Sequence, residues 1–221
     1  MNTIEILNEV ASQVAVCKNC ILHHSRNKSV PGDGPHNAKV MLIGEGPGFH
    51  ENQQGKPFVG AAGKFLDELL GSADLKRSDV FITNVVKCRP PGNRDPQPEE
   101  LEACAIYLNR QIEVINPMVI VTLGRFSMAK FLGNNVKISL VHGQAKKVKG
   151  RMIIAMYHPA AALHQPSLKS TVISDFAMLP EFIKQMDSEN GGSKKKVTHP
   201  LPVEIFEEDN SKPPASQLSL F

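Results

Sequence analysis

Short apolar runs alternate with segments of helical periodicity along residues 1–186. Four of these runs are typical of buried parallel strands, because they are short, continuous and rich in branched residues. They lie at residues 39–44, 80–86, 118–123 and 151–156. Between them, apolar residues at helical spacing predict helices over residues 3–15, 63–70, 98–115, 125–132 and 168–186, and residues 137–149 suggest a turn and a β-ribbon. This alternation predicts an α/β fold in which a mostly parallel sheet carries helices on both faces.

The composition of the chain changes after residue 186. Residues 187–221 are rich in glycine, proline, serine and charged side chains, and they contain too few apolar residues to form a core. We therefore expect one globular domain over residues 1–186, followed by a flexible tail over residues 187–221.

Signals for a membrane or an export route are missing from the sequence. The N-terminal segment MNTIEILNEVASQV contains acidic residues and no long apolar run, and no stretch of about 18 consecutive apolar residues occurs anywhere. These features predict a cytoplasmic protein without a membrane partner. The formal net charge of +3 is compatible with a polyanionic partner but does not identify one.

The chain has four cysteines, Cys17, Cys20, Cys88 and Cys104. Disulfides are a weak interpretation, because cytosolic thiols stay reduced. Buried, inert cysteines are an alternative, although a CxxC pair at the end of a helix is a common half of a metal site. Four thiolates suit either zinc or an iron–sulfur cluster. The second pair brackets a proline-rich loop and the start of a helix, and this wide spacing favours a 4Fe–4S cluster.

Polar residues stand at the carboxyl ends of the predicted strands. Glu45 follows the first strand, Asn84 lies in the last part of the second, Gly124 follows the third and His158 closely follows the fourth. Ligands of open parallel sheets bind beyond these strand ends. The glycines of residues 44–48 would let a ligand approach the backbone closely. The sequence therefore predicts a binding site at this edge of the sheet.

Three segments carry a resemblance to a known family. GEGPGFHENQQGKPFVGAAGKFLDELL, TNVVKCRPPGNRDPQPEE and YHPAAALHQP occur in this order, with the cysteines placed around them. In these motifs the chain resembles the family 4 uracil-DNA glycosylases over roughly residues 1–186. The resemblance implies a three-layer fold of the uracil-DNA glycosylase superfamily, with a four-stranded parallel sheet and a 4Fe–4S cluster that is structural. It also implies a reaction in which uracil is flipped out of DNA and its N-glycosidic bond is hydrolysed, leaving an abasic site for base excision repair.

The resemblance gives each candidate residue a role in that reaction. Phe58 would stack on the uracil ring, and the Asn84 amide, with its donor and acceptor, would read the Watson–Crick edge. Catalysis would be mainly electrostatic, and His158 would stabilise the departing uracil anion as a neutral donor. The remaining assignments are Glu45 and the Gly46 backbone for the attacking water, Glu51 for the exclusion of thymine, and Leu163 as a wedge in the DNA stack.

The chain departs from the family pattern at one position and in one short segment. Asn52 stands where the family usually has aspartate, and Ala162, Leu163 and His164 replace a typical Leu-Leu-Arg, so that a phosphate-binding arginine is missing. Two other functions stay open. One is a non-catalytic iron–sulfur DNA-binding module that accompanies replication, which would not need Glu45, Phe58, Asn84 and His158 together. The other is a glycosylase that accepts a broader range of bases.

The last five residues suggest a partner. Gln217, Leu218, Ser219, Leu220 and Phe221 form an apolar hook with a polar anchor at the end of the predicted tail. QLSLF resembles the motif that binds the bacterial sliding clamp, and this implies docking of residues 217–221 on the replication clamp of a bacterium. A flexible tail would let the hook reach that partner while the domain searches DNA. We expect the protein itself to be a monomer.

Overall fold

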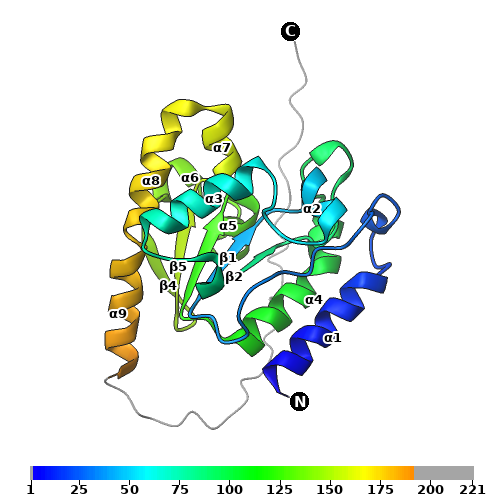
Figure 1. Ribbon diagram of the computed structural model, residues 1–221, viewed down its shortest axis with the longest axis horizontal. Coiled ribbons are helices and arrows are strands. Elements are labelled where there is room, and N and C mark those ends of the chain that lie inside the picture. Colours follow the sequence, from blue (N-terminus) through cyan, green and yellow to red (C-terminus); the bar gives the residue numbers. More distant parts are fainter. Residues whose placement is uncertain (1, 192–221) are drawn as a thin grey trace, which may run out of the picture.

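The computed structural model describes residues 2–191 of the chain. The Gln217, Leu218, Leu220 and Phe221 hook lies outside the described residues. Within them, one sheet has the strand order β2-β1-β3-β5-β4 (Figure 1). Its strands are β1 (Val40–Gly44), β2 (Val80–Asn84), β3 (Val119–Leu123), β4 (Ala145–Val148) and β5 (Arg151–Met156). The first four in this order are parallel to one another, and β4 is antiparallel to β5. The expected four-stranded parallel sheet is therefore present, but the predicted β-ribbon adds a fifth, antiparallel edge strand to it.

Helices cover both faces of the sheet. Every residue of β1, β2 and β3 is buried, which explains why these strands appear as continuous apolar runs. Alternate β1 residues belong to different cores: Val40 and Leu42 pack toward one face, and Met41 and Ile43 toward the other. The first face is covered by α3 (Ala61–Ser72), α8 (Lys169–Ala177) and α9 (Leu179–Gly191). The second face is covered by α4 (Pro98–Ile115) and α5 (Arg125–Leu132). This gives the expected three layers.

Further helices complete the described part of the chain. The first helix, α1 (Thr3–Val16), packs against α4 and begins with a capping box in which Asn2 and Glu5 exchange hydrogen bonds. Shorter helices are α2 (Phe49–Gln54), α6 (Ile138–Val141), α7 (Pro159–His164) and the 3₁₀ turns η1 (Ile21–His23), η2 (Arg77–Asp79), η3 (Pro91–Asn93) and η4 (Pro166–Leu168). Residues 2–191 contain no helix with the length and apolar character needed to cross a membrane.

The C-terminal helix differs from the prediction in two ways. The expected helix over residues 168–186 is divided into α8 and α9 around Met178, and Pro180 is the second residue of α9. Proline is accepted there because it lies in the first turn, where its missing N–H has no helical partner. In addition, α9 continues to Gly191, past the expected start of the tail at residue 187. Asp187 pairs with Lys39 at 2.8 Å and Glu189 pairs with Lys147, so charged residues that suggested a solvated tail fasten α9 to the domain.

Candidate active site

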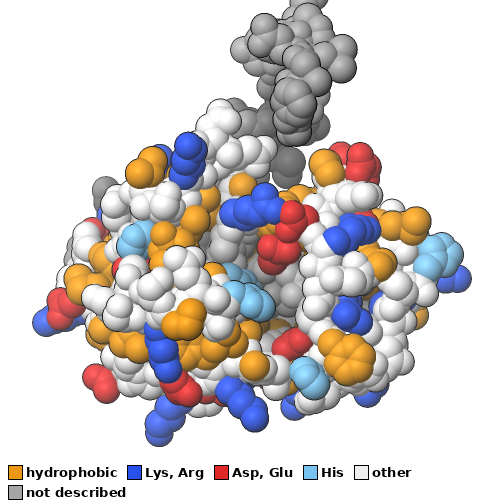
Figure 2. Space-filling view, turned by 90° about the horizontal axis from the view of Figure 1, so that it is seen from above, with side chains coloured by type: hydrophobic (Ala, Val, Ile, Leu, Met, Phe, Trp, Pro, Cys, Tyr) orange, Lys and Arg blue, Asp and Glu red, His pale blue; other side chains and the backbone are white. Residues whose placement is uncertain are grey.

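A pocket of about 420 Å³ opens at the carboxyl ends of the parallel strands. Figure 2 looks onto this side of the molecule and shows a hollow near its centre, with histidine, acidic and basic side chains around it. The strand ends, the N-terminal ends of α2 and α7, and the loop before α3 come together here. The pocket-lining candidates from the sequence are Glu45, Gly46, Glu51, Phe58, Asn84 and His158. Leu163 is not among the lining residues and stands 46% exposed on α7.

Phe58 is held in the pocket wall by an unusual backbone. Its φ is 52°, a left-handed conformation that is costly for a residue with a side chain. Glu51 stabilises this loop, because one of its carboxylate oxygens accepts hydrogen bonds from the backbone N–H groups of Val59 at 2.8 Å and Gly60 at 3.0 Å. Position 63 must be glycine, because a Cβ there would lie 1.9 Å from the Phe58 carbonyl oxygen. The role of Glu51 against thymine stays a prediction.

Asn84 presents an amide with an unused acceptor. The residue is 1% exposed, and its Oδ1 has no hydrogen-bond partner within residues 2–191. A buried polar atom without a partner costs about 1–3 kcal/mol, so the site is suited to a ligand that supplies a donor. Gly44 leaves the necessary space, because a Cβ there would lie 2.4 Å from this Oδ1 and 2.7 Å from the Phe58 ring.

Lys87 fixes the end of β2 from inside the protein. This lysine is 1% exposed, and its Nζ donates to Thr83 Oγ1 at 2.6 Å, to the Asn84 carbonyl at 2.9 Å and to Gln111 Oε1 at 2.7 Å. All three of its donors are thereby used. This role could not be predicted from the sequence, because lysine is almost never fully buried unless it is paired.

His158 is the N-cap of α7, and its hydrogen bond defines its chemistry. Nδ1 lies 3.1 Å from the backbone nitrogen of Ala160 and accepts its N–H, which leaves the proton of the neutral ring on Nε2. Burial lowers the pKa of His158 to about 4, although the Glu51 carboxylate acts in the opposite direction. The rings of His158 and Phe58 are stacked with centroids 5.5 Å apart. The pocket therefore holds a neutral imidazole, with its one N–H donor on Nε2, next to the aromatic ring of Phe58.

Glu45 stands directly after β1 at the pocket wall. Burial raises the pKa of its carboxyl group, the nearby Asp95 carboxylate raises it further, and Arg125 lowers it. Arg125 and Asp95 also form an ion pair with each other. Beside Glu45, Gly46 must lack a side chain, because a Cβ there would lie 2.8 Å from a methyl group of Val86.

The four cysteines come together away from this pocket. Cys17, Cys20, Cys88 and Cys104 line one small cavity between α1, η1 and α4. Three of the sulfurs accept hydrogen bonds: Cys17 from the Asn19 backbone at 3.5 Å, Cys88 from Arg26 at 3.5 Å and Cys104 from the Lys87 backbone at 3.2 Å. Among residues 2–191, no three His, Cys, Asp or Glu side chains form a group that could hold a metal ion. The thiols are thus gathered, but the arrangement does not by itself define a metal centre.

Comparison with known proteins identifies the family. The model of the uracil DNA glycosylase superfamily matches residues 31–179. The chain belongs to this superfamily. It is 47% identical to a type-4 uracil-DNA glycosylase of Archaeoglobus fulgidus, over 80% of this chain and 94% of that protein. It is 44% identical to a type-4 uracil-DNA glycosylase of Sulfurisphaera tokodaii, over 80% of this chain and 85% of that protein. These matches confirm the type-4 resemblance.

A third relative bears on the alternative function. The chain is 32% identical to a DNA polymerase of Bacillus phage SP01, over 74% of this chain but only 18% of that protein. The superfamily domain thus also occurs as a small part of a much longer protein. The type-4 matches are closer and span nearly whole proteins, which favours the enzyme.

The two departures from the family pattern have different structural consequences. Asn52 is buried and does not line the pocket; its Oδ1 accepts the Asn27 N–H at 2.9 Å, and its carbonyl accepts the Lys28 N–H at 2.9 Å. Asn52 therefore holds α2 against Asn27 and Lys28, in the loop that precedes β1. His164, in contrast, lines the pocket.

Arg94 is a pocket residue that the sequence analysis missed. It lines the pocket and pairs with the buried Glu100 at 2.5 Å, and this pairing lowers the pKa of the Glu100 carboxyl group. The only sequence signal is the charge pair across the start of α4, which resembles an ordinary helix-capping arrangement.

Proposed function

We propose that the chain is a uracil-DNA glycosylase that flips uracil into the pocket, hydrolyses the N-glycosidic bond and leaves an abasic site in DNA. The similarity to type-4 uracil-DNA glycosylases supports the glycosylase activity, and one observation supports the assignment of that activity to this pocket. The buried Asn84 amide, with an unpartnered acceptor, lies in the same pocket as the Phe58 ring and the neutral His158. A pyrimidine that offers an N–H donor next to a carbonyl acceptor would match these groups.

Uracil meets that requirement and cytosine does not. Uracil can donate its N3–H to Asn84 Oδ1 and accept from the amide Nδ2 at O4, while its ring rests on Phe58. Cytosine has an acceptor at N3 and a donor at C4, so both contacts would be mismatched. Rejection by unmatched buried polar groups is stronger than rejection by shape alone. Base selection is therefore assigned to Asn84.

Bond cleavage relies on His158 and Glu45. As the glycosidic bond breaks, negative charge develops on uracil O2. The Nε2–H of the neutral His158 ring can donate a hydrogen bond to that oxygen. The positive charge that develops on the sugar would be stabilised by the Glu45 carboxylate. Water held by Glu45 and the Gly46 backbone would add to C1′ of the sugar and lose one proton, and the uracil anion would take up a proton to leave as neutral uracil. Loss of one such donor costs about 10²–10³ in rate. Leu163 on α7 is proposed to fill the vacated position in the DNA stack.

The direct test of this function is the release of uracil from DNA. Purified protein is incubated with a labelled oligonucleotide that contains one uracil, then treated with alkali and run on a gel. We expect a break at the uracil position and none in matched oligonucleotides with thymine or cytosine. Tight binding without a break would support the DNA-binding module instead. Breaks at other modified bases would indicate the broader glycosylase.

The four cysteines are proposed to hold a 4Fe–4S cluster with a structural role. The thiol donor set fits such a group, because hydrogen bonds from Asn19, Arg26 and Lys87 reach three of the sulfurs and would stabilise negatively charged cluster ligands. The cluster would tie α1, the segment after β2 and α4 together. Since Lys87 also holds the Asn84 carbonyl, the same segment would support the base-reading residue.

We therefore expect the purified protein to be brown, with a broad visible absorption and about four iron atoms per chain. The Cys88→Ser variant should contain less iron and have a lower thermal midpoint. His23→Ala is a matched control, because His23 lines the same cavity but is not a proposed ligand. Iron analysis and thermal denaturation check this. A colourless wild-type protein with one zinc ion would contradict it.

We also propose that the enzyme is a monomer that acts in the bacterial cytoplasm, at the nucleoid.

A further proposal is that residues 217–221 bind the bacterial sliding clamp. A labelled peptide of residues 210–221 should bind a bacterial sliding clamp in the micromolar range, because ordering a flexible peptide offsets much of its contact free energy. Polarisation measures the affinity, and peptides with Leu220→Ala and Phe221→Ala serve as controls. Equal binding by these controls would remove the proposal.

A further inference from the structure

An exposed aromatic residue stands next to the pocket and is not used by the proposed reaction. Phe49 is the first residue of α2 and is 52% exposed. The residue before it, Gly48, and Glu51 in the same helix both line the pocket. Single exposed apolar side chains are common on protein surfaces. An aromatic ring beside a proposed nucleotide pocket is nevertheless the kind of side chain on which bases stack.

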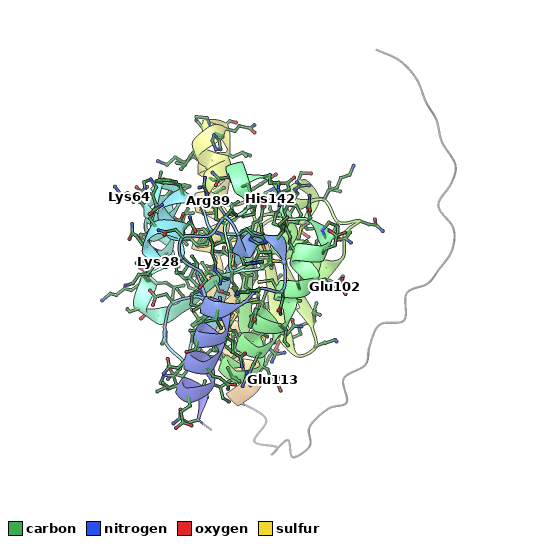
Figure 3. All side chains as sticks on the ribbon, turned by 90° about the vertical axis from the view of Figure 1, so that its right-hand side faces the viewer. Lys28, Lys64, Arg89, Glu102, Glu113 and His142 are labelled. Carbon is green, nitrogen blue, oxygen red and sulfur yellow. The ribbon has the colours of Figure 1, made fainter. Side chains whose placement is uncertain are left out.

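Arg89, from the loop after β2, lies over the Phe49 ring. Its guanidinium carbon is 5.3 Å from the ring centroid, and its Nε donates to Asn93 Oδ1 at 2.8 Å. Asn93 in turn lines the pocket. Figure 3 shows Arg89 at the upper end of the molecule, the end at which Lys64 also lies and opposite to Glu113. The ring and the guanidinium therefore form a pair at the pocket rim, joined from segments 40 positions apart in the sequence.

The charge of Arg89 is available to a ligand. The two other arginines near the pocket are each paired with a carboxylate, Arg94 with Glu100 and Arg125 with Asp95. Within residues 2–191, the ion pairs found do not include Arg89. A guanidinium that is held over an aromatic ring and is not neutralised is well suited to a phosphate group.

We propose that Phe49 and Arg89 form a second stacking site, outside the uracil pocket, for a nucleotide next to the flipped uracil. The His50 ring makes a T-shaped contact with the Phe49 ring, with centroids 5.4 Å apart. The neighbouring base would stack on the exposed part of the Phe49 ring, and its phosphate would bind Arg89. The site lies on α2, and the proposed wedge residue Leu163 lies on α7. Both helices contribute residues to the pocket lining, and they stand apart in Figure 1. DNA would then be held on both sides of the flipped nucleotide. This supplies a phosphate-binding arginine that the loop after His158 lacks. The inference rests on the proposed function.

The test uses the full-length protein and an oligonucleotide that contains a non-cleavable 2′-fluoro analogue of deoxyuridine. Phe49→Ala should weaken binding about 5- to 160-fold, which is the loss of about 1–3 kcal/mol typical of one base–aromatic contact. Phe49→Trp should restore it, because tryptophan offers a larger stacking face. Ile106→Ala is the matched control, since Ile106 is 63% exposed on α4 and does not line the pocket; its binding should stay within about twofold of the wild type.

Two further measurements separate a binding role from a structural one. At saturating cleavable DNA, the single-turnover rate of Phe49→Ala should stay within about twofold of the wild type, because the contact is the same before and during the reaction. Fluorescence of 2-aminopurine placed on either side of the uracil should be quenched by the wild type on one side, and Phe49→Ala should remove that quenching. Arg89→Gln should weaken binding and reduce its salt dependence.

The outcomes are distinguishable. Wild-type protein that releases no uracil would overturn the proposed function. Wild-type protein that releases uracil, with Phe49→Ala binding DNA equally tightly or leaving the quenching unchanged, would overturn the stacking site alone. A lower thermal midpoint together with an equal loss of binding and rate would show that Phe49 is a structural residue, and this too would overturn the stacking site.

Discussion

Replacing His158 with alanine is expected to slow uracil release by about 10²- to 10³-fold while the affinity for uracil-containing DNA changes little. The reason is that the charge on uracil O2, which His158 Nε2–H would stabilise, develops only as the bond breaks. Single-turnover kinetics measure the rate, and binding to the non-cleavable analogue measures the affinity. His36→Ala is a suitable control, because His36 is exposed and lies outside the pocket. Near-normal turnover of His158→Ala would contradict the electrostatic role.

The pH dependence of the reaction follows from the same residue. Burial lowers the pKa of His158 to about 4, so the ring is neutral at and above pH 5 and becomes charged only as the pH falls toward 4. The proposed active form is the neutral one. His158 should therefore cause no loss of rate between pH 8 and pH 5, and a loss should begin near pH 4. The opposite result would be a rate that falls with a pKa near the usual value of about 6.5. If that fall disappeared in His158→Gln, it would show that the imidazole of His158 is solvated.

Asn84→Ala is expected to lower kcat/KM for uracil-containing DNA by about 10²- to 10⁴-fold. Two hydrogen bonds to the base would be lost, each contributing about 1.5–2.5 kcal/mol in a buried site. Discrimination between uracil and cytosine should weaken as well, because the group that distinguishes them is gone. Steady-state kinetics on paired uracil and cytosine oligonucleotides check both effects. Asn134→Ala, at an exposed asparagine outside the pocket, serves as a control.

The stability of Asn84→Ala gives a second readout. Oδ1 of Asn84 has no partner in the described part of the chain, so removing the amide takes no hydrogen bond of that oxygen from the folded protein. We expect the thermal midpoint to stay within a few degrees of the wild type although activity is strongly reduced. A large drop in the midpoint would mean that Asn84 is part of the framework of the fold.

The sheet could be predicted from the sequence because its strands are buried on both faces. Such strands leave uninterrupted apolar runs, and the polar residues at or just beyond their carboxyl ends, Glu45, Asn84 and His158, line the pocket. The short helices α2 and α7 were missed. Each has six residues, which is too few for a helical period to show. They are formed by their surroundings rather than by their own sequence.

Contacts between distant segments could not be predicted. The burial of Lys87 depends on acceptors from β2 and α4, and the Phe49–Arg89 pair depends on α2 and the loop after β2, which meet only in the folded chain. Asp187 and Glu189 were assigned to a tail because residues 187–221 as a whole are rich in glycine, proline, serine and charge and poor in apolar residues. Their lysine partners lie 148 and 42 positions away, and such pairs leave no local pattern. The family resemblance indicated which residues are important, but not how the rest of the chain holds them.

The aromatic wall of the pocket also limits how this sequence can evolve. Phe58 takes the space that a side chain at Gly44 or Gly63 would need, and Asn84 shares the space at Gly44. A substitution at either glycine would displace groups proposed to recognise the base, although neither glycine need touch DNA. A Cβ at position 63 would meet the backbone of Phe58, which every residue at position 58 retains, and a Cβ at position 44 would meet both the Asn84 amide and the Phe58 ring. A second substitution at position 58 alone would therefore relieve neither clash. Relatives of this chain should therefore keep glycine at both positions.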